Sequence, residues 1–467
     1  MTTSYFAERA WLPEGWRQNV RIDVDERGTI TDTRIDSPGD AAGDAAIRLS
    51  GSVIPGLANV HSHAFQRAMA GLAERASGDM GSFWTWRQVM YKLARHITPD
   101  RLEVIARQAY IEMLKAGFTA VGEFHYLHND ADGTPYVDPA ELSRRAITAA
   151  RDVGLAITHL PVLYMRAGFD GGELTPAQRR FTTGPERLLD IAGDLRRGFA
   201  GDPDVTIGLA IHSLRAVAPE DLLTTVVAAR AESDDTAVGP IHIHAAEQPR
   251  EVEGARAALG APPVAWLLDQ AGVDAGWCLV HATHMTAEER DGLARSGAVA
   301  GLCPITEANL GDGLFPLPGY LKAGGRIGIG SDSNVCISAI EELRLLEYGQ
   351  RLFNGRRPAT KVADGGSPGA ALYNRAAMGG ALALGRRMGA LITGARADFV
   401  VLDGDHPALA AAPEAALFDR LLFAASQSPV RDVYVGGHHV VTDGHHPREA
   451  ETLAAFARLV GELAETL

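Results

Sequence analysis

Cysteine is scarce in this chain, and long apolar runs are absent. The 467 residues include three cysteines, Cys278, Cys303 and Cys336, which are far apart and lie in apolar surroundings. Their spacing does not match a zinc finger, so we interpret them as small buried residues in a reducing compartment. No run approaches the ~18 apolar residues of a membrane span, and the N-terminus lacks a basic segment followed by an apolar core. The sequence therefore favours a cytoplasmic protein that does not enter a membrane.

Positive charge is also in short supply. The chain has 44 Lys and Arg residues against 58 Asp and Glu, which gives a formal net charge of -14. Nonspecific binding to nucleic acid or to an anionic membrane needs basic patches, so the composition argues against both partners. It leaves room for an anionic small molecule, because local arginines decide that binding. With 46% hydrophobic residues, the chain can bury a large core.

The succession of apolar runs predicts an α/β fold with a (β/α)8 barrel of the TIM type. Residues 1–52 alternate in short stretches that are typical of a small β-meander. From Val53 onward, short apolar runs alternate with amphipathic helical stretches, as in repeated βα units. Eight runs are the number that closes such a barrel, and they lie near residues 53–60, 118–124, 155–163, 206–211, 241–246, 277–282, 298–303 and 326–331.

Strand patterns return after the predicted barrel, at residues 398–403 and 432–437. We therefore expect the two ends of the chain to form one small β-sandwich module beside the barrel. The predicted division assigns 1–52 to the N-terminal part of this module and 53–384 to the metal-dependent barrel. Residues 385–467 would form the C-terminal part of the module and a terminal helix.

His61 and His63 end the first predicted barrel strand. Side chains alternate along a strand, so these two imidazoles point the same way. Such a pair suits Zn²⁺, which takes nitrogen ligands at about 2.0–2.1 Å. Taken alone, the pair is equally compatible with ordinary polar residues at a strand end. Other strand ends must supply the remaining ligands.

Titratable residues occupy the ends of further predicted strands. The C-terminal ends of the strands carry the active site in barrels of this type. Each residue alone is readily explained as a hydrogen-bonded histidine or a helix cap, but their coincidence indicates a metal-centred active site. The residues are Glu123, His125, Tyr126, His212, Arg215, His242, His244, Glu247, His281 and Asp332.

The chain resembles the amidohydrolase superfamily, in its branch of mononuclear deaminases and chlorohydrolase-like enzymes. The motifs are His-x-His after the first strand, His-x-x-Glu after the fifth, a histidine after the sixth, an aspartate after the eighth and the closing segment 394–402. The resemblance implies one divalent metal ion with four protein ligands, His61, His63, His244 and Asp332. It implies that Glu247 and His281 handle protons, with Asp332 helping His281 to orient and deprotonate the attacking water.

Two alternatives remain within this predicted metal site. His242 faces the same side as His244 and competes as a ligand, although only His244 gives the His-x-x-Glu spacing. No lysine ends the fourth strand, where dinuclear relatives place one, and this indicates a single ion. Zinc is the first choice, with iron and manganese as alternatives, because ligand type rarely fixes the metal.

A closer resemblance concerns the substrate. Segments 61–67, 83–87, 122–126 and 212–215 resemble the formimidoylglutamate deiminases of histidine degradation. The resemblance implies hydrolysis of N-formimidoyl-L-glutamate to N-formyl-L-glutamate and ammonia, and it suggests a homodimer. Such a substrate has two carboxylates, and arginine forks bind carboxylates bidentately. The predicted substrate-binding residues are Arg87 and Arg215 for the carboxylates, with Gln66, Tyr126 and His212 for further hydrogen bonds.

Alternatives to these assignments also remain. Arg87 could be a solvated arginine, Trp84 and Trp86 could be core aromatics, and Arg166 is a further candidate for a carboxylate. A related deaminase of a purine, pyrimidine or triazine ring would favour stacking surfaces over two arginine forks. An inactive barrel that serves as a binding scaffold would usually lose ligands, and none is missing here. Histidines interpreted as structural or surface residues are His96, His128, His159, His284, His438, His439, His445 and His446.

Overall fold

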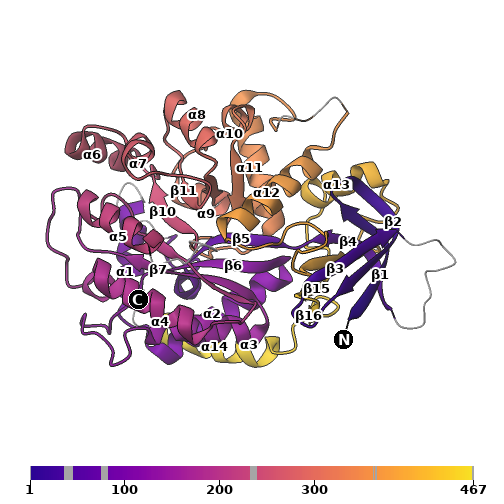
Figure 1. The fold of residues 1–467 in the computed structure, drawn as a ribbon, viewed down its shortest axis with the longest axis horizontal. Helices are drawn as coiled ribbons and strands as arrows, with labels where there is room; N and C mark the ends of the chain where they lie inside the picture. The colour runs from indigo at the N-terminus through magenta and orange to yellow at the C-terminus, as the bar shows by residue number, and fades with distance from the viewer. Residues whose placement is uncertain are drawn as a thin grey trace.

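The computed structural model describes residues 2–35, 46–74, 83–231, 239–360, 362 and 365–464, with the backbone alone at 83–85. Within these ranges the chain forms a barrel and a curled β-sheet beside it (Figure 1). No helix among the described residues is both long and apolar enough to span a membrane. The described residues therefore form the two parts that the sequence predicts, a barrel and a β module.

The barrel strands are parallel and follow one another in chain order. They are β5 (Leu57–Ser62), β6 (Phe118–His125), β7 (Ala156–Leu163), β8 (Val205–Ile207) with β9 (Leu209–Ile211), β10 (Ile241–Ala245), β11 (Trp277–His281), β12 (Val299–Leu302) and β13 (Arg326–Ile329). β8 and β9 share one position, and the strand is interrupted at Gly208, where a Cβ would lie 2.5 Å from the Pro240 carbonyl oxygen. The pairing of Ile329 with Asn59 joins β13 to β5, so the sheet closes and the predicted (β/α)8 barrel is confirmed.

Helices cover the outside of the barrel (Figure 1). Several begin with proline, whose missing N–H group is not needed in the first turn. Between helices and strands lies the main hydrophobic core, which includes Ile243, Leu279 and Ile327. The helices that follow the barrel strands are α1 (Phe83–Ala94), α2 (Pro99–Lys115), α3 (Glu141–Val153), α4 (Pro185–Gly198), α5 (Pro219–Ala231), α6 (Pro249–Leu259), α7 (Pro263–Gln270), α8 (Ala287–Ser296), α9 (Pro304–Leu310), α10 (Leu317–Lys322), α11 (Ala339–Asn354) and α12 (Pro368–Ala383).

The two ends of the chain combine in one β module, as predicted, and its strands form a single seven-stranded sheet. Its order is β16-β15-β14-β4-β1-β2-β3, and its strands are β1 (Thr3–Leu12), β2 (Gly15–Val24), β3 (Ile30–Ile35), β4 (Ile47–Pro55), β14 (Phe399–Leu402), β15 (Val430–Val435) and β16 (His438–Val441). Tyr5 of β1 and Tyr434 of β15 are three strands apart, which is about 14 Å in a flat sheet. Their ring centroids are 5.6 Å apart. The sheet therefore curls over its own apolar core.

The junctions between the two bodies are short. Gly56 alone separates β4 of the curled sheet from β5 of the barrel, so the predicted run 53–60 contains parts of two strands. The terminal helix α14 (Glu449–Ala464) lies along α2 of the barrel, where Leu459 and Leu463 are buried (Figure 1). The predicted division at 52/53 and 384/385 stays a proposal.

One prediction about the thiols is wrong. Cys278 and Cys303 are buried, but Cys336 is exposed. It follows β13 in the loop that leads to α11, and an apolar neighbourhood in the sequence did not place it in the core. All three cysteines are free.

Candidate active site

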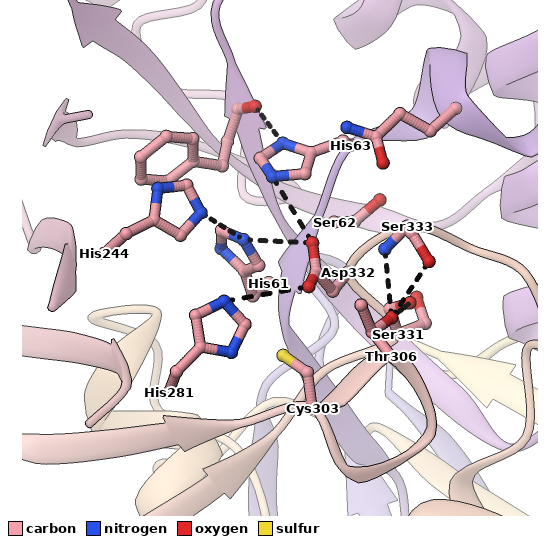
Figure 2. A network of polar contacts seen from close by, with 12 residues as sticks. His61, Ser62, His63, His244, His281, Cys303, Thr306, Ser331, Asp332 and Ser333 are labelled. Carbon is pink, nitrogen blue, oxygen red and sulfur yellow. Dashed lines mark hydrogen bonds and ion pairs between the residues drawn. The ribbon is translucent and has the colours of Figure 1, made fainter. Parts of the chain in front are cut away.

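Three imidazoles and one carboxylate converge at the C-terminal ends of β5, β10 and β13. Nε2 of His61 and Nε2 of His63 lie 3.5 and 3.4 Å from Oδ1 of Asp332. Nε2 of His244 lies 3.0 Å from Nε2 of His61. Figure 2 shows the three rings directed toward Asp332, two from the end of β5 and one from β10. The structure thus brings together the four side chains predicted to hold a metal.

Backbone carbonyls fix the orientation of two of these rings. Nδ1 of His63 donates to the Phe124 carbonyl at 2.9 Å, and Nδ1 of His244 donates to the His212 carbonyl at 2.9 Å. Each hydrogen bond leaves the Nε2 lone pair facing the centre of the group. Partners of this kind orient the histidine ligands of metal sites and fix their tautomers.

The closing seam of the barrel positions the carboxylate. The Asp332 N–H donates to the His61 carbonyl at 2.9 Å, and the His63 N–H donates to the Asp332 carbonyl at 2.9 Å. Asp332 has a φ of 46°, which is uncommon for a residue with a side chain. The backbone pairing that closes the barrel therefore also sets Asp332 against the histidine pair.

A buried polar network supports this seam. The Asn59 amide donates to Ser331 Oγ at 2.6 Å, and Ser331 Oγ donates to Asn334 Oδ1 at 2.6 Å. The Asn334 amide in turn donates to the His63 carbonyl at 3.1 Å. The sequence analysis did not single out Asn59 or Asn334, because an asparagine inside a barrel strand carries no motif of its own.

The charge states of the cluster match those of metal ligands. Burial lowers the pKa of His61 to about 3, and it also lowers the pKa of His63 and of His244. Burial alone would raise the pKa of Asp332, but its contacts with the three neighbouring imidazoles, His61 first, hold it below its ordinary value. Neutral imidazole and ionised carboxylate are the forms that bind metals.

The donor set fits a zinc-like ion. Three imidazole nitrogens and a carboxylate oxygen are common ligands of Zn²⁺, and nitrogens on one tetrahedral ion stand roughly 3.3 Å apart. The ligand atoms of His61, His63 and His244 all lie within 4.8 Å of one another. Nε2 of His61 and Nε2 of His244 are 3.0 Å apart, close to the spacing of two nitrogens on one such ion. These side chains can therefore hold a metal ion.

Glu247 and His281 lie beside this cluster. Nε2 of His281 is 3.8 Å from Oε1 of Glu247 and 3.8 Å from Oδ2 of Asp332. Burial raises the pKa of Glu247 to about 7. Burial opposes protonation of His281, but the carboxylates of Glu247, Glu307 and Asp332 raise its pKa to about 10. The pair can exchange protons with a group bound next to the metal ligands.

Two further glutamates hold this pair, and the sequence analysis missed both. Glu307 Oε1 lies 3.3 Å from Nδ1 of His281 and accepts the Cys303 N–H at 2.9 Å. Glu251 accepts the N–H groups of Ala246 and Glu247 at 3.2 and 3.0 Å. Glu307 lies four residues beyond Cys303, and Glu251 four beyond Glu247. Both glutamates bind the backbone at a strand end, so they could have been found only if the exact ends of β10 and β12 had been known.

A cavity of ≈ 560 Å³ opens above the metal-ligand cluster. The structure places all five predicted substrate-binding residues in its wall: Gln66, Arg87, Tyr126, His212 and Arg215. The buried Glu247, His281 and Asp332 also line it. A groove toward the surface shares Arg87, Arg215 and Glu247 with the cavity, and the two arginines, which are only partly buried, lie at its mouth.

Arg87 comes from helix α1 (Phe83–Ala94), which crosses the mouth of the cavity. Its Nε donates to the hydroxyl of Tyr91, and its guanidinium carbon lies 5.0 Å from the centre of that ring. The fully buried Arg180 holds the other end of the helix, donating to the Ala94 and Ile97 carbonyls. A cation at a helix C-terminus is favourable. Trp86 lines the cavity, whereas the side chain of Trp84 lies outside the described part.

Some residues expected at the rim do not reach the cavity. Phe124 faces the metal-ligand cluster, so Glu123 and His125 on either side point away from it: Glu123 accepts the Ala64 N–H at 2.8 Å, and His125 packs on His159. Nε2 of His242 donates to the Ala383 carbonyl at 2.7 Å, two residues below His244. Arg166 donates to the Leu214 carbonyl at 2.9 Å and does not line the cavity.

Comparison with known proteins decides the family. A model described as "Amidohydrolase family" matches residues 52–440. The chain belongs to the amidohydrolase family. The predicted membership is thus confirmed, and metal dependence is a property of this family that the histidine clusters fit.

Individual relatives match nearly the whole amidohydrolase chain. It is 50% identical to formimidoylglutamate deiminase from Pseudomonas aeruginosa, over 99% of this chain and 100% of the relative. It is 31% identical to a 5-methylthioadenosine/S-adenosylhomocysteine deaminase from Natronomonas pharaonis, over 89% of this chain and 87% of the relative. The crystal structure of an amidohydrolase from Brucella melitensis superposes with a TM-score of 0.92 at 44% identity, covering 99% of this chain and 100% of the other.

We expect replacement of His244, but not of His242, to remove the metal. His244→Gln deletes a converging ligand, and its effect on zinc affinity should exceed the roughly 10–100-fold loss typical of an outer-shell change. His242→Gln keeps an amide that can donate to Ala383 and serves as the matched control. Zinc content after dialysis, measured by mass spectrometry, checks this. Equal zinc in both variants would contradict the ligand assignment.

Proposed function

We propose that this amidohydrolase converts N-formimidoyl-L-glutamate and water to N-formyl-L-glutamate and ammonia. One observation carries the proposal: a single cavity is lined by the buried Glu247, His281 and Asp332, to which we assign metal binding and proton handling, and by two partly exposed arginines. The substrate also has two different ends, an amidine that would meet the metal-binding and proton-handling residues and a glutamate part with two carboxylates that would meet the arginines. The identity of 50% to a formimidoylglutamate deiminase supports this function.

One metal ion, with zinc as the first choice, would be held by His61, His63, His244 and Asp332. When bound, such an ion would make a hydroxide nucleophile available at neutral pH, because a metal lowers the pKa of water toward neutrality. The remaining steps rest on residues of the chain itself.

Glu247 would carry a proton to the nitrogen that leaves. Water adds its oxygen to the amidine carbon, the bond from this carbon to the terminal nitrogen breaks, and that nitrogen departs as ammonia. The protonated His281 would orient the water and the Asp332 carboxylate would accept its proton, because Nε2 of His281 lies 3.8 Å from both Glu247 Oε1 and Asp332 Oδ2. A group with a pKa near neutrality both gives and takes protons efficiently, and burial gives Glu247 this property.

The mouth of the cavity would bind the glutamate part. Arg87 and Arg215 would pair with the two carboxylates, since a guanidinium matches a carboxylate with two parallel N–H groups. The Gln66 amide donates to the Tyr126 hydroxyl at 2.7 Å, which holds both side chains toward the substrate. His212 would add a hydrogen bond, and burial lowers its pKa so that it stays neutral.

A second candidate is deamination of a purine or another nitrogen heterocycle. Tyr91, Tyr126, Tyr164 and Phe181 line the cavity and could stack on a ring. Two arginines at the mouth are less suited to such a substrate. A binding scaffold without activity ranks last, since all four ligands and both proton-handling residues are in place. A homodimer and a cytoplasmic location remain part of this proposal.

We expect purified, zinc-loaded protein to release ammonia from N-formimidoyl-L-glutamate. Guanine, cytosine and adenosine serve as comparison substrates in the same coupled ammonia assay. Glu247→Gln, which keeps the size of the side chain but cannot carry the proton, should lower kcat by about 10²–10⁴-fold without loss of zinc. Ammonia release from a nucleobase or nucleoside alone would replace this proposal with the second candidate.

The two arginines provide a separate test of the substrate. Arg87→Met and Arg215→Met should each lower kcat/KM for N-formimidoyl-L-glutamate by about 10–150-fold, because a hydrogen bond to a charged group contributes about 1.5–3 kcal/mol. Most of the loss should be in KM. The exposed Arg256, which lies on α6 outside the cavity, supplies the control Arg256→Met. Unchanged kinetics in both cavity variants would refute carboxylate binding by this pair.

A further inference from the structure

A second cluster of metal-ligating groups lies beside the first. His281, Cys303 and Asp332 each offer one ligand atom, and these three atoms lie within 4.8 Å of one another. All three residues are buried. Figure 2 shows the sulfur of Cys303 directed into the space between His281 and Asp332. This thiol has no part in the hydrolytic chemistry described above.

The two oxygens of Asp332 face different clusters. Oδ1 faces Nε2 of His61 and His63, at 3.5 and 3.4 Å, whereas Oδ2 faces Nε2 of His281 at 3.8 Å. One carboxylate can therefore serve two neighbouring ions, one through each oxygen. Nδ1 of His281 is occupied by Glu307 at 3.3 Å, so Nε2 is the ring atom available to a second ion.

We propose that His281, Cys303 and Asp332 form a second metal site, which takes a thiophilic divalent cation such as Cd²⁺ and inhibits the enzyme when occupied. Thiolate and imidazole ligands select soft and borderline metals. Binding forms bonds to Cys303 Sγ, His281 Nε2 and Asp332 Oδ2, and any proton on Sγ or Nε2 passes to the solvent. The inhibitory part of the proposal rests on the proposed function, because it assigns proton handling to His281.

Geometry makes this site weaker than the first and favours a large ion. A thiolate and an imidazole on the same tetrahedral Zn²⁺ stand roughly 3.6 Å apart, given Zn–S of about 2.3 Å and Zn–N of about 2.0–2.1 Å. Nε2 of His281 and Oδ2 of Asp332 are 3.8 Å apart, farther than the 3.5 and 3.4 Å from Oδ1 of Asp332 to the first-site imidazoles, which leaves room for a larger ion with less movement of the side chains. The site also offers only three protein ligands. Cd²⁺ should therefore fill it before excess Zn²⁺ does.

The other two thiols provide the control. Cys336 is exposed and is the obvious competing position for a thiophilic ion. Cys278 is buried on β11, and none of the described metal-ligating clusters includes it. Cys336→Ser should therefore remove surface binding and leave the proposed site intact. Cys303→Ser and Cys303→Ala, each made in the Cys336→Ser background, should abolish the proposed site.

The test is a titration of the zinc-loaded full chain with Cd²⁺, followed by ultraviolet thiolate-to-metal charge-transfer absorption and by metal analysis. Cys336→Ser should develop the band and bind an additional ion, and the two Cys303 variants should do neither. Ammonia release should survive in the Cys303 variants to a Cd²⁺ concentration roughly tenfold higher or more, as expected when a site loses a ligand.

The outcomes separate the two proposals. A band of the same strength in the Cys303 variants, or its absence from Cys336→Ser, would overturn the second site. The ultraviolet absorption measurement needs no substrate, so it tests the second site even if N-formimidoyl-L-glutamate is not hydrolysed. If one Cys303 variant fails to fold, the other decides. Binding at Cys303 with undiminished ammonia release would overturn the inhibitory role of the site.

Discussion

Closure of the barrel between β13 and β5 is the constraint on which the active site depends. Two backbone hydrogen bonds of Asp332, one with His61 and one with His63, extend this closure. They also fix Asp332 between the two histidines. A shift of one residue in this register would turn the histidine pair to the other face of β5. The buried network of Asn59, Ser331 and Asn334 opposes such a shift, because breaking it would leave polar groups unpaired inside the barrel.

Catalytic function demands features that cost stability. His281 and Asp332 have φ values of 67° and 46°, and residues with side chains adopt this region at a cost of order 1–3 kcal/mol. Three imidazoles are buried against one another, and His63 and His244 turn unprotonated Nε2 atoms inward. A cation at their centre offsets this arrangement, so binding of the metal should stabilise the folded chain as well as supply chemistry.

Much of the site could be predicted from the sequence, because parallel strands bring all their C-terminal ends to one rim. The spacing His-x-His and His-x-x-Glu thus placed His61, His63, His244 and Glu247 together without knowledge of any helix. It was harder to predict which alternate residues of a strand face the inside of the barrel. In β6, Phe124 faces inward, so Glu123 and His125 face the helices. Arg180 acts on backbone carbonyls of a distant helix end, and Glu251 and Glu307 accept backbone N–H groups four or five residues earlier in a spacing that is not a recognised motif. The exposure of Cys336 likewise depends on the loop and not on its apolar neighbours.

The central claim is that four residues distant in sequence bind one catalytic ion. Anomalous diffraction from crystals of the metal-loaded enzyme, recorded on both sides of the zinc absorption edge, tests it most directly. The account predicts a strong peak coordinated by Nε2 of His61, His63 and His244 and by a carboxylate oxygen of Asp332. A peak bound elsewhere, or one that excludes Asp332 and His244, would contradict it.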